Sequence, residues 1–232
     1  MTVAASVSAE LIKLADEELF AGHVLTSVSG WGPELEINLA MSSMGQDELG
    51  HARLLYGLAV GTDRDRINDL IYARPPGEFR AAALSSVYSK QWEMLVVKHF
   101  LYESADAERL RLLAGSTPEL AEAAAKMRSE EDFHLEFWTS WFDRTARIDH
   151  ARVQKALSAL WPSAAGLFDF GEGGLFTPAS AREAADDWSS RITSRLTSLG
   201  FSLPSVAEEP VDDSQRILDE MRIVYNDAPG RW

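Results

Sequence analysis

Glu48-Leu49-Gly50-His51 and Glu131-Asp132-Phe133-His134 are two Glu-x-x-His tetrads that lie 83 residues apart in the chain. Each tetrad falls in a long stretch with apolar residues at spacings of three and four, which predicts an amphipathic helix. Residues i and i+3 share a helix face, so each tetrad offers a carboxylate and an imidazole to one point. Bundle-type two-metal proteins use two such tetrads and a lone Glu from each of two further helices. The tetrads therefore predict a carboxylate-bridged two-metal site in an all-α, four-helix bundle.

The hydrophobic pattern around the tetrads predicts four long helices that form two antiparallel hairpins. Gly-Pro and Pro-Gly stretches separate these helices, and glycine or proline marks most of their ends. The expected helices cover residues 8–28, 33–61, 79–113 and 118–149, and a polar connection through Arg74-Pro75-Pro76-Gly77 precedes the third. Further helices are expected at 151–161, 178–200 and 217–224, with a loop at 166–174 and an extended linker at 202–214.

A pseudo-repeat relates the two hairpins and points to the remaining ligands. Pro33-Glu34-Leu35 recurs as Pro118-Glu119-Leu120 at an offset of 85 residues. The same offset carries Glu18 onto Glu103, and in an antiparallel hairpin each of these lies at nearly the height of its tetrad. The repeat therefore selects Glu18 and Glu103, with the neighbouring acids Glu17 and Asp106 as alternatives.

Four carboxylates on apolar helix faces need neutralisation, because an unpaired buried charge is strongly unfavourable. Two divalent metals would balance the four charges, and two imidazoles would complete a ligand set that suits iron, or alternatively manganese. Open positions on the metals would accept dioxygen. The predicted metal ligands and catalytic residues are Glu18, Glu48, His51, Glu103, Glu131 and His134.

Several residues near the predicted ligands can be interpreted in more than one way. Asp47 and Glu130 precede the tetrad glutamates and could hydrogen-bond a ligand histidine of the opposite hairpin, or could be surface acids. His99 lies one turn before Glu103 and is interpreted as a core histidine, with contact to a metal ligand or proton donation on the substrate side as the alternatives. We interpret His23 and His150 as structural or exposed, the tryptophans as packing residues rather than a radical relay, and Arg109 and Arg111 as solvated or phosphate-binding.

Composition sets limits on partners and location. The chain has 232 residues, 46% of them hydrophobic, which predicts one large domain over 1–200 and a tail over 201–232. A net charge of -14 argues against nucleic acid and membrane surfaces as partners. There is no cysteine, so the metal ligands must be histidine and carboxylate. The N-terminus does not resemble a signal peptide, and we expect a cytoplasmic protein.

Several motifs resemble the phenylacetic acid catabolic family, whose members are ferritin-like subunits of phenylacetyl-CoA epoxidase. The flanking motifs resemble the structural subunit of that family, whereas the two metal motifs resemble the catalytic subunit. The flanking motifs are Leu14-Ala15-Asp16, Gly22-His23, Pro33 through Ala40, Leu49-Gly50, Ala52-Arg53, Ala159-Leu160-Trp161-Pro162, Glu220-Met221 and Pro229 through Trp232; the metal motifs are Gln46 through His51 and Glu130 through His134.

The resemblance implies a di-iron oxygenase subunit that transfers one atom of dioxygen to an aromatic CoA thioester and releases the other as water. It also implies homo- or hetero-oligomers with related oxygenase subunits. An external flavin and iron-sulfur reductase is expected, because a chain without cysteine has no thiolates for an iron-sulfur cluster. Two other functions remain open at this point: a non-catalytic scaffold in such a complex, and ferritin-like iron oxidation.

Overall fold

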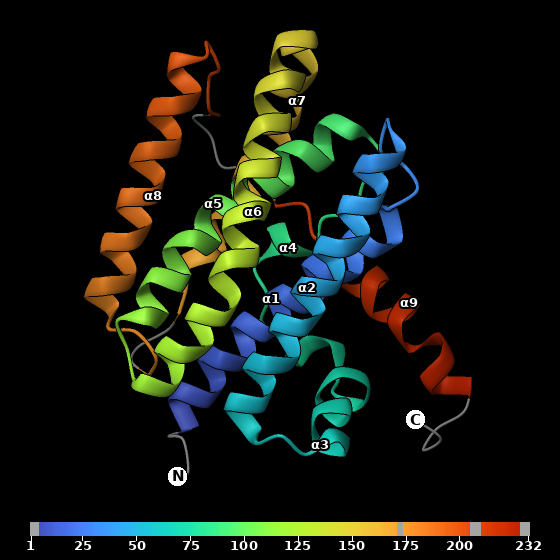
Figure 1. The fold of residues 1–232 in the computed structure, drawn as a ribbon, viewed down its shortest axis with the longest axis vertical. Coiled ribbons are helices and arrows are strands. Elements are labelled where there is room, and N and C mark those ends of the chain that lie inside the picture. Colours follow the sequence, from blue (N-terminus) through green and yellow to red (C-terminus); the bar gives the residue numbers. More distant parts are fainter. Residues whose placement is uncertain (1–4, 171–173, 205–209, 228–232) are drawn as a thin grey trace. The chain divides into compact units, whose positions relative to one another are not determined.

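The computed structural model describes residues 5–170, 174–204 and 210–227. These residues form helices and turns but no strand, which confirms the prediction of an all-α chain (Figure 1). The elements in chain order are α1 (Ala5–Val28), α2 (Leu35–Val60), α3 (Arg64–Asn68), the π-helix η1 (Asp69–Ala73), the 3-10 helix η2 (Pro76–Glu78), α4 (Ala83–Ser86), α5 (Trp92–Ala114), α6 (Pro118–Ile148), α7 (His150–Leu160), the 3-10 helix η3 (Trp161–Phe168), α8 (Pro178–Ser198) and α9 (Ser214–Asp227).

The chain divides into two compact units. The first contains the described residues up to Ala81, residues 85–88 and the described residues from Asp212 onward. The second contains residues 82–84 and the described residues between Ser89 and Val211. The C-terminal helix α9 thus belongs to the first unit, while the proposed division at residue 200 stays a prediction. Each unit is built on one of the two expected hairpins, α1 with α2 and α5 with α6.

The first hairpin has the ends that its sequence predicts. In the first turn of α2, the Asn38 side chain accepts from the Gly32 amide at 2.7 Å and donates to the Gly32 and Glu34 carbonyls, which fixes the connection before Leu35. At its other end, Gly61 adopts a φ of +91°, a conformation that glycine tolerates and other residues rarely do. Local features of the chain, the side chain of Asn38 at one end and the conformation of Gly61 at the other, therefore mark both limits of α2.

The prediction of one helix over 79–113 is wrong at its start, because α5 begins only at Trp92. Before Trp92, backbone donors are used by distant side chains of the first unit. The Arg80 amide donates to Asp16 at 3.0 Å, and the Tyr88 amide donates to Asp213 at 2.8 Å. A continuous helix would need those amides for its own hydrogen bonds. The expected polar connection also contains α3, capped by Asp63, and η1.

Asp16 is the centre of a buried polar cluster in the first unit. Its carboxylate accepts from the Tyr56 hydroxyl at 2.5 Å and from the Arg74 guanidinium, in addition to the Arg80 amide. Arg74 also lies 3.7 Å above the Phe79 ring. Burial raises the pKa of Asp16 even though Arg74 opposes that shift. The cluster ties α1 and α2 to the segment that leads toward α5.

We predict that Tyr56→Phe lowers the free energy of unfolding by about 1.5–3 kcal/mol, the usual contribution of a hydrogen bond to a charged group. The ring keeps its packing, whereas Asp16 loses one of its three donors. Urea denaturation measures the change. Tyr72→Phe is the matched control, because Tyr72 contributes its ring to a stack with Tyr225 at 5.4 Å rather than its hydroxyl to a buried acid. Equal stability of the two variants would contradict the assigned role of the Tyr56 phenol.

The second unit surrounds α5 with helices that the sequence largely predicted. Thr117 caps α6 by accepting from the Leu120 amide, and Thr177 caps α8 by accepting from the Ser180 amide at 3.1 Å. Helices α6, α7 and α8 and the segment η3 all contact α5. Most of α5 is buried, including polar side chains such as Lys98, Glu103 and Arg109, whereas Arg111 is exposed.

Helix α9 packs in the first unit through Ile217 and Leu218, which are buried. His23 of α1 lies 3.5 Å from Glu220 of α9, and burial lowers the pKa of His23. His150, in the second unit, is exposed and stacks on Phe201 at 4.0 Å. Parts of the expected loop (171–173), the expected linker (205–209) and the chain end (228–232) lie outside the described residues. Among the described helices, none combines the length and apolar character that a membrane span requires.

Candidate metal centre

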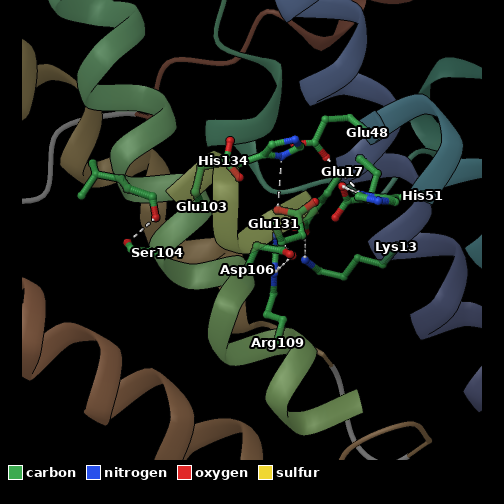
Figure 2. A network of polar contacts seen from close by, with 12 residues as sticks. Lys13, Glu17, Glu48, His51, Glu103, Ser104, Asp106, Arg109, Glu131 and His134 are labelled. Carbon is green, nitrogen blue, oxygen red and sulfur yellow. Dashed lines mark hydrogen bonds and ion pairs between the residues drawn. The ribbon is translucent and has the colours of Figure 1, made fainter. Parts of the chain in front are cut away.

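The first unit gathers one predicted half of the ligand set. Glu18 comes from α1, and Glu48 and His51 come from α2; all three are buried. The His51 Nδ1 atom lies 4.0 Å from a carboxylate oxygen of Glu18 and 4.0 Å from one of Glu48. Ligand atoms of all three lie within 4.8 Å of one another, and Figure 2 shows Glu48 and His51 among the polar residues. This half contains two carboxylates and one imidazole.

Close approach of α1 and α2 accounts for the position of Glu48. A Cβ atom at Gly22 would lie 2.9 Å from the Glu48 Cβ and 2.9 Å from the Gly45 carbonyl oxygen. A Cβ at Gly45 would similarly lie 2.8 Å from the Thr26 methyl. Only glycine at both positions lets the helices approach this closely. The glycine pair is therefore part of what places a carboxylate of α2 against α1.

The second unit gathers the other half. Glu103 comes from α5, and Glu131 and His134 come from α6; all three are buried. His134 Nδ1 lies 3.5 Å from a Glu131 oxygen, and ligand atoms of the three lie within 4.8 Å of one another. Figure 2 shows these side chains in stick form. The second unit thus repeats the composition of the first half, as the pseudo-repeat predicts.

The two alternative acids have cations on their own helices. Lys13 donates to Glu17 one turn away on α1, and Arg109 donates to Asp106 at 2.7 Å and 3.0 Å on α5 (Figure 2). Neither acid falls in the ligand groupings of its unit. Arg109 is buried and lies 4.9 Å from the centre of the Tyr102 ring, so the interpretation of it as a solvated or phosphate-binding residue is wrong. The spacing of three residues between Asp106 and Arg109 could have predicted this ion pair from the sequence.

His99 contacts a candidate ligand directly. Its Nδ1 lies 3.3 Å from a Glu103 oxygen, and its ring stacks on Trp138 with centroids 4.7 Å apart. Burial, with help from the nearby Lys98 and His134, holds the pKa of His99 well below its usual value. The imidazole is therefore neutral and packed in the core. A role for it next to the ligands stays a prediction.

Asp47 and Glu130 differ in exposure. Asp47 is half-buried on α2, and Glu130 is exposed on α6. Their suggested hydrogen bonds to ligand histidines stay predictions.

The donor atoms fit a hard divalent transition metal. Each half offers carboxylate oxygens and one imidazole and no thiolate, a combination that suits iron or manganese. Two carboxylates per half would balance one divalent ion per half, which removes the cost of burying those charges. The residues present therefore fit two metal ions per chain.

Comparison with known proteins relates the chain to one family. A family model described as phenylacetic acid catabolic protein matches residues 3–231. One of the subunits of the 1,2-phenylacetyl-CoA epoxidase of Escherichia coli (strain K12) is 28% identical over 172 residues, which are 72% of this chain and 69% of that subunit. The sequence motifs had pointed to the same family.

Proposed function

Because the chain belongs to the phenylacetic acid catabolic protein family, we propose that it is the metal-binding component of an oxygenase that acts on an aromatic CoA thioester. The observation that carries this proposal is the pair of buried Glu-Glu-His sets, one in each unit. A purely structural helix pair gains nothing from burying two carboxylates beside an imidazole, whereas a metal site requires them.

The carboxylate and histidine ligands have different roles in the proposed site. The carboxylates supply negative charge, and Glu48 and Glu131 would each hold a metal together with the histidine that shares their helix face. The histidines His51 and His134 bind as neutral imidazoles. When bound, two ferrous ions supply the reduction of dioxygen that allows one oxygen atom to enter the substrate while the other leaves as water. Burial of all six side chains keeps bulk water from the donor atoms.

The proposed reaction needs partner subunits and a source of electrons. The similar protein from Escherichia coli is by its name one subunit of an epoxidase, so we propose that this chain also works in an assembly of several subunits. Electrons must come from outside the chain, because a protein without cysteine has no thiolates for an iron-sulfur cluster. A separate flavin and iron-sulfur reductase fills this role.

Oxygen transfer tests the proposal. The chain, purified with its co-expressed partner subunits and loaded anaerobically with ferrous iron, is given a reductant, isotopically labelled dioxygen and phenylacetyl-CoA. We expect one labelled oxygen atom in the thioester product, detected by mass spectrometry. The double variant Glu48→Ala/Glu131→Ala should give none. Labelled product at the wild-type rate from the double variant would exclude this chain as the site of the reaction.

A scaffold is the second candidate, because the similar protein is a subunit of a larger enzyme and the flanking motifs resemble the structural subunit of the family. In that case another subunit would supply the metals. The same double variant separates the two candidates. A scaffold predicts a stoichiometric complex with unchanged turnover, whereas the metal-binding component predicts a complex without turnover.

A further inference from the structure

A row of aromatic rings leads away from the candidate ligand Glu103 inside the second unit. His99, which contacts Glu103, stacks on Trp138 with centroids 4.7 Å apart. The Trp138 ring lies 6.0 Å from that of Trp92, and Trp92 meets Trp141 edge-on at 5.2 Å. Successive rings are thus close to van der Waals contact. Electron tunnelling weakens exponentially with distance, so a row with such short steps favours electron transfer.

Exposure to solvent is greater at the outer end of the row than at its inner end. Trp138 is 0% exposed, whereas Trp92 and Trp141 are partly exposed. Among the residues that the structure describes, Trp138 Nε1 has no hydrogen-bond partner. An oxidised Trp138 would therefore have no neighbour to accept its indole proton and would remain a radical cation, which is strong enough as an oxidant to take an electron from Trp92.

The outer end of the row has a different environment. The Arg144 guanidinium lies 4.5 Å from the centre of the Trp141 ring. A cation at that distance disfavours a positive charge on the ring, so an oxidised Trp141 would lose its indole proton to the adjacent water. Loss of the proton leaves a neutral radical there and makes the transfer hard to reverse. Trp138 would therefore be reduced again by its neighbour, whereas Trp141 would remain oxidised as a neutral radical.

We propose that Trp138, Trp92 and Trp141 carry one oxidising equivalent from the metal centre to the surface when the centre has reacted with dioxygen and no substrate is bound. In balance, the centre gains one electron, and Trp138 loses one and recovers it from Trp92. Trp92 recovers one from Trp141, and Trp141 gives up an electron and a proton. A soluble reductant such as a flavin or a thiol then restores Trp141. This inference rests on the proposed function, since it needs the oxidised metal centre.

The proposal departs from the interpretation of the tryptophans as packing residues. Packing alone would account for the burial of Trp138. It gives no reason for a buried indole N–H without a partner, which costs free energy. Trp188 shows the ordinary arrangement in the same unit: it is buried, stacks on Trp161 at 5.8 Å, and donates to the Ser104 hydroxyl at 2.8 Å.

The test uses the full chain, loaded with ferrous iron and exposed to dioxygen without substrate. Freeze-quench electron paramagnetic resonance on protein with ring-deuterated tryptophan detects a tryptophan radical, and peptide mass spectrometry locates oxidised tryptophan. We expect a tryptophan radical and oxidation at Trp141 and Trp92 in the wild type. Trp138→Phe should lose both signals, because phenylalanine is much harder to oxidise. Trp188→Phe is the matched control and should keep both.

The iron content and the rate of iron oxidation of the same samples separate the possible failures. Protein that binds no iron would overturn both this inference and the proposed function. Iron that is bound and oxidised normally, together with unchanged Trp141 oxidation in Trp138→Phe, would overturn only the relay. If Trp138→Phe does not fold, Trp92→Phe replaces it, since Trp92 is only partly buried. That variant should lose oxidation at Trp141, and retention of it would equally overturn the relay.

Discussion

Glu131→Gln is expected to weaken iron binding by at least about 100-fold, because loss of a mere partner of a metal ligand already costs about 10–100-fold. The amide keeps the size of the side chain but removes a negative charge and one strong donor oxygen. Glu131 is buried beside His134 at 3.5 Å, so solvent cannot replace that oxygen easily. Anaerobic titration with ferrous iron, followed by metal analysis after desalting, measures the loss.

Glu136→Gln is the matched control for this prediction. Glu136 lies on the same helix and is exposed, so the change in net charge is identical and the site is untouched. The control should bind iron like the wild type. Similar losses in both variants would mean that overall charge, and not the Glu131 carboxylate, governs binding, and this result would contradict the assignment of Glu131.

Gly22→Ala is expected to lower the free energy of unfolding by about 2–3 kcal/mol, the upper part of the range for overpacking a well-packed core. The new methyl group would lie 2.9 Å from both the Glu48 Cβ and the Gly45 carbonyl oxygen. Neither atom is at the end of a flexible side chain, so the two helices must separate. Glu48 should move with α2, and iron binding should weaken as well. Chemical denaturation and ferrous titration measure the two effects.

Gly50→Ala is the control, because Gly50 lies in the middle of the same helix as Glu48 and a Cβ there would meet nothing within 4 Å. Alanine in an exposed helix interior is favoured over glycine by up to about 1 kcal/mol, so this variant should be more stable than the wild type. The two substitutions are chemically identical and should have opposite signs. Stabilisation by Gly22→Ala would show that α1 and α2 do not approach as closely as the structure has them.

The sequence predicted the helices well where local signals decide them. Thr117 and Pro118 mark the start of α6, and Gly61 marks the end of α2, because capping and glycine conformation act within a few residues. The start of α5 could not be predicted in the same way. It depends on the amides of Arg80 and Tyr88, which bond to acids far away in the chain.

In the candidate site, too, features set by local spacing could be predicted, and features set by contacts between helices could not. The tetrads were visible because a spacing of three residues places Glu and His on one helix face. The choice of Glu18 over Glu17 needed the pseudo-repeat and stays a prediction, while Glu17 pairs with Lys13. The contact of His99 with Trp138 joins two different helices, and no spacing within either helix indicates it. For that reason the sequence alone indicated packing, and the relay that we propose needed the structure.

We propose that the two Glu-Glu-His sets of the chain bind two metal ions. An anomalous-scattering map at the iron edge, from crystals of the iron-loaded protein, tests this most directly. We expect about two iron peaks per chain, as in other carboxylate-bridged bundles, coordinated by Glu18, Glu48, His51, Glu103, Glu131 and His134. Iron bound only elsewhere, or no peak at these side chains in protein that is folded and loaded, would contradict it.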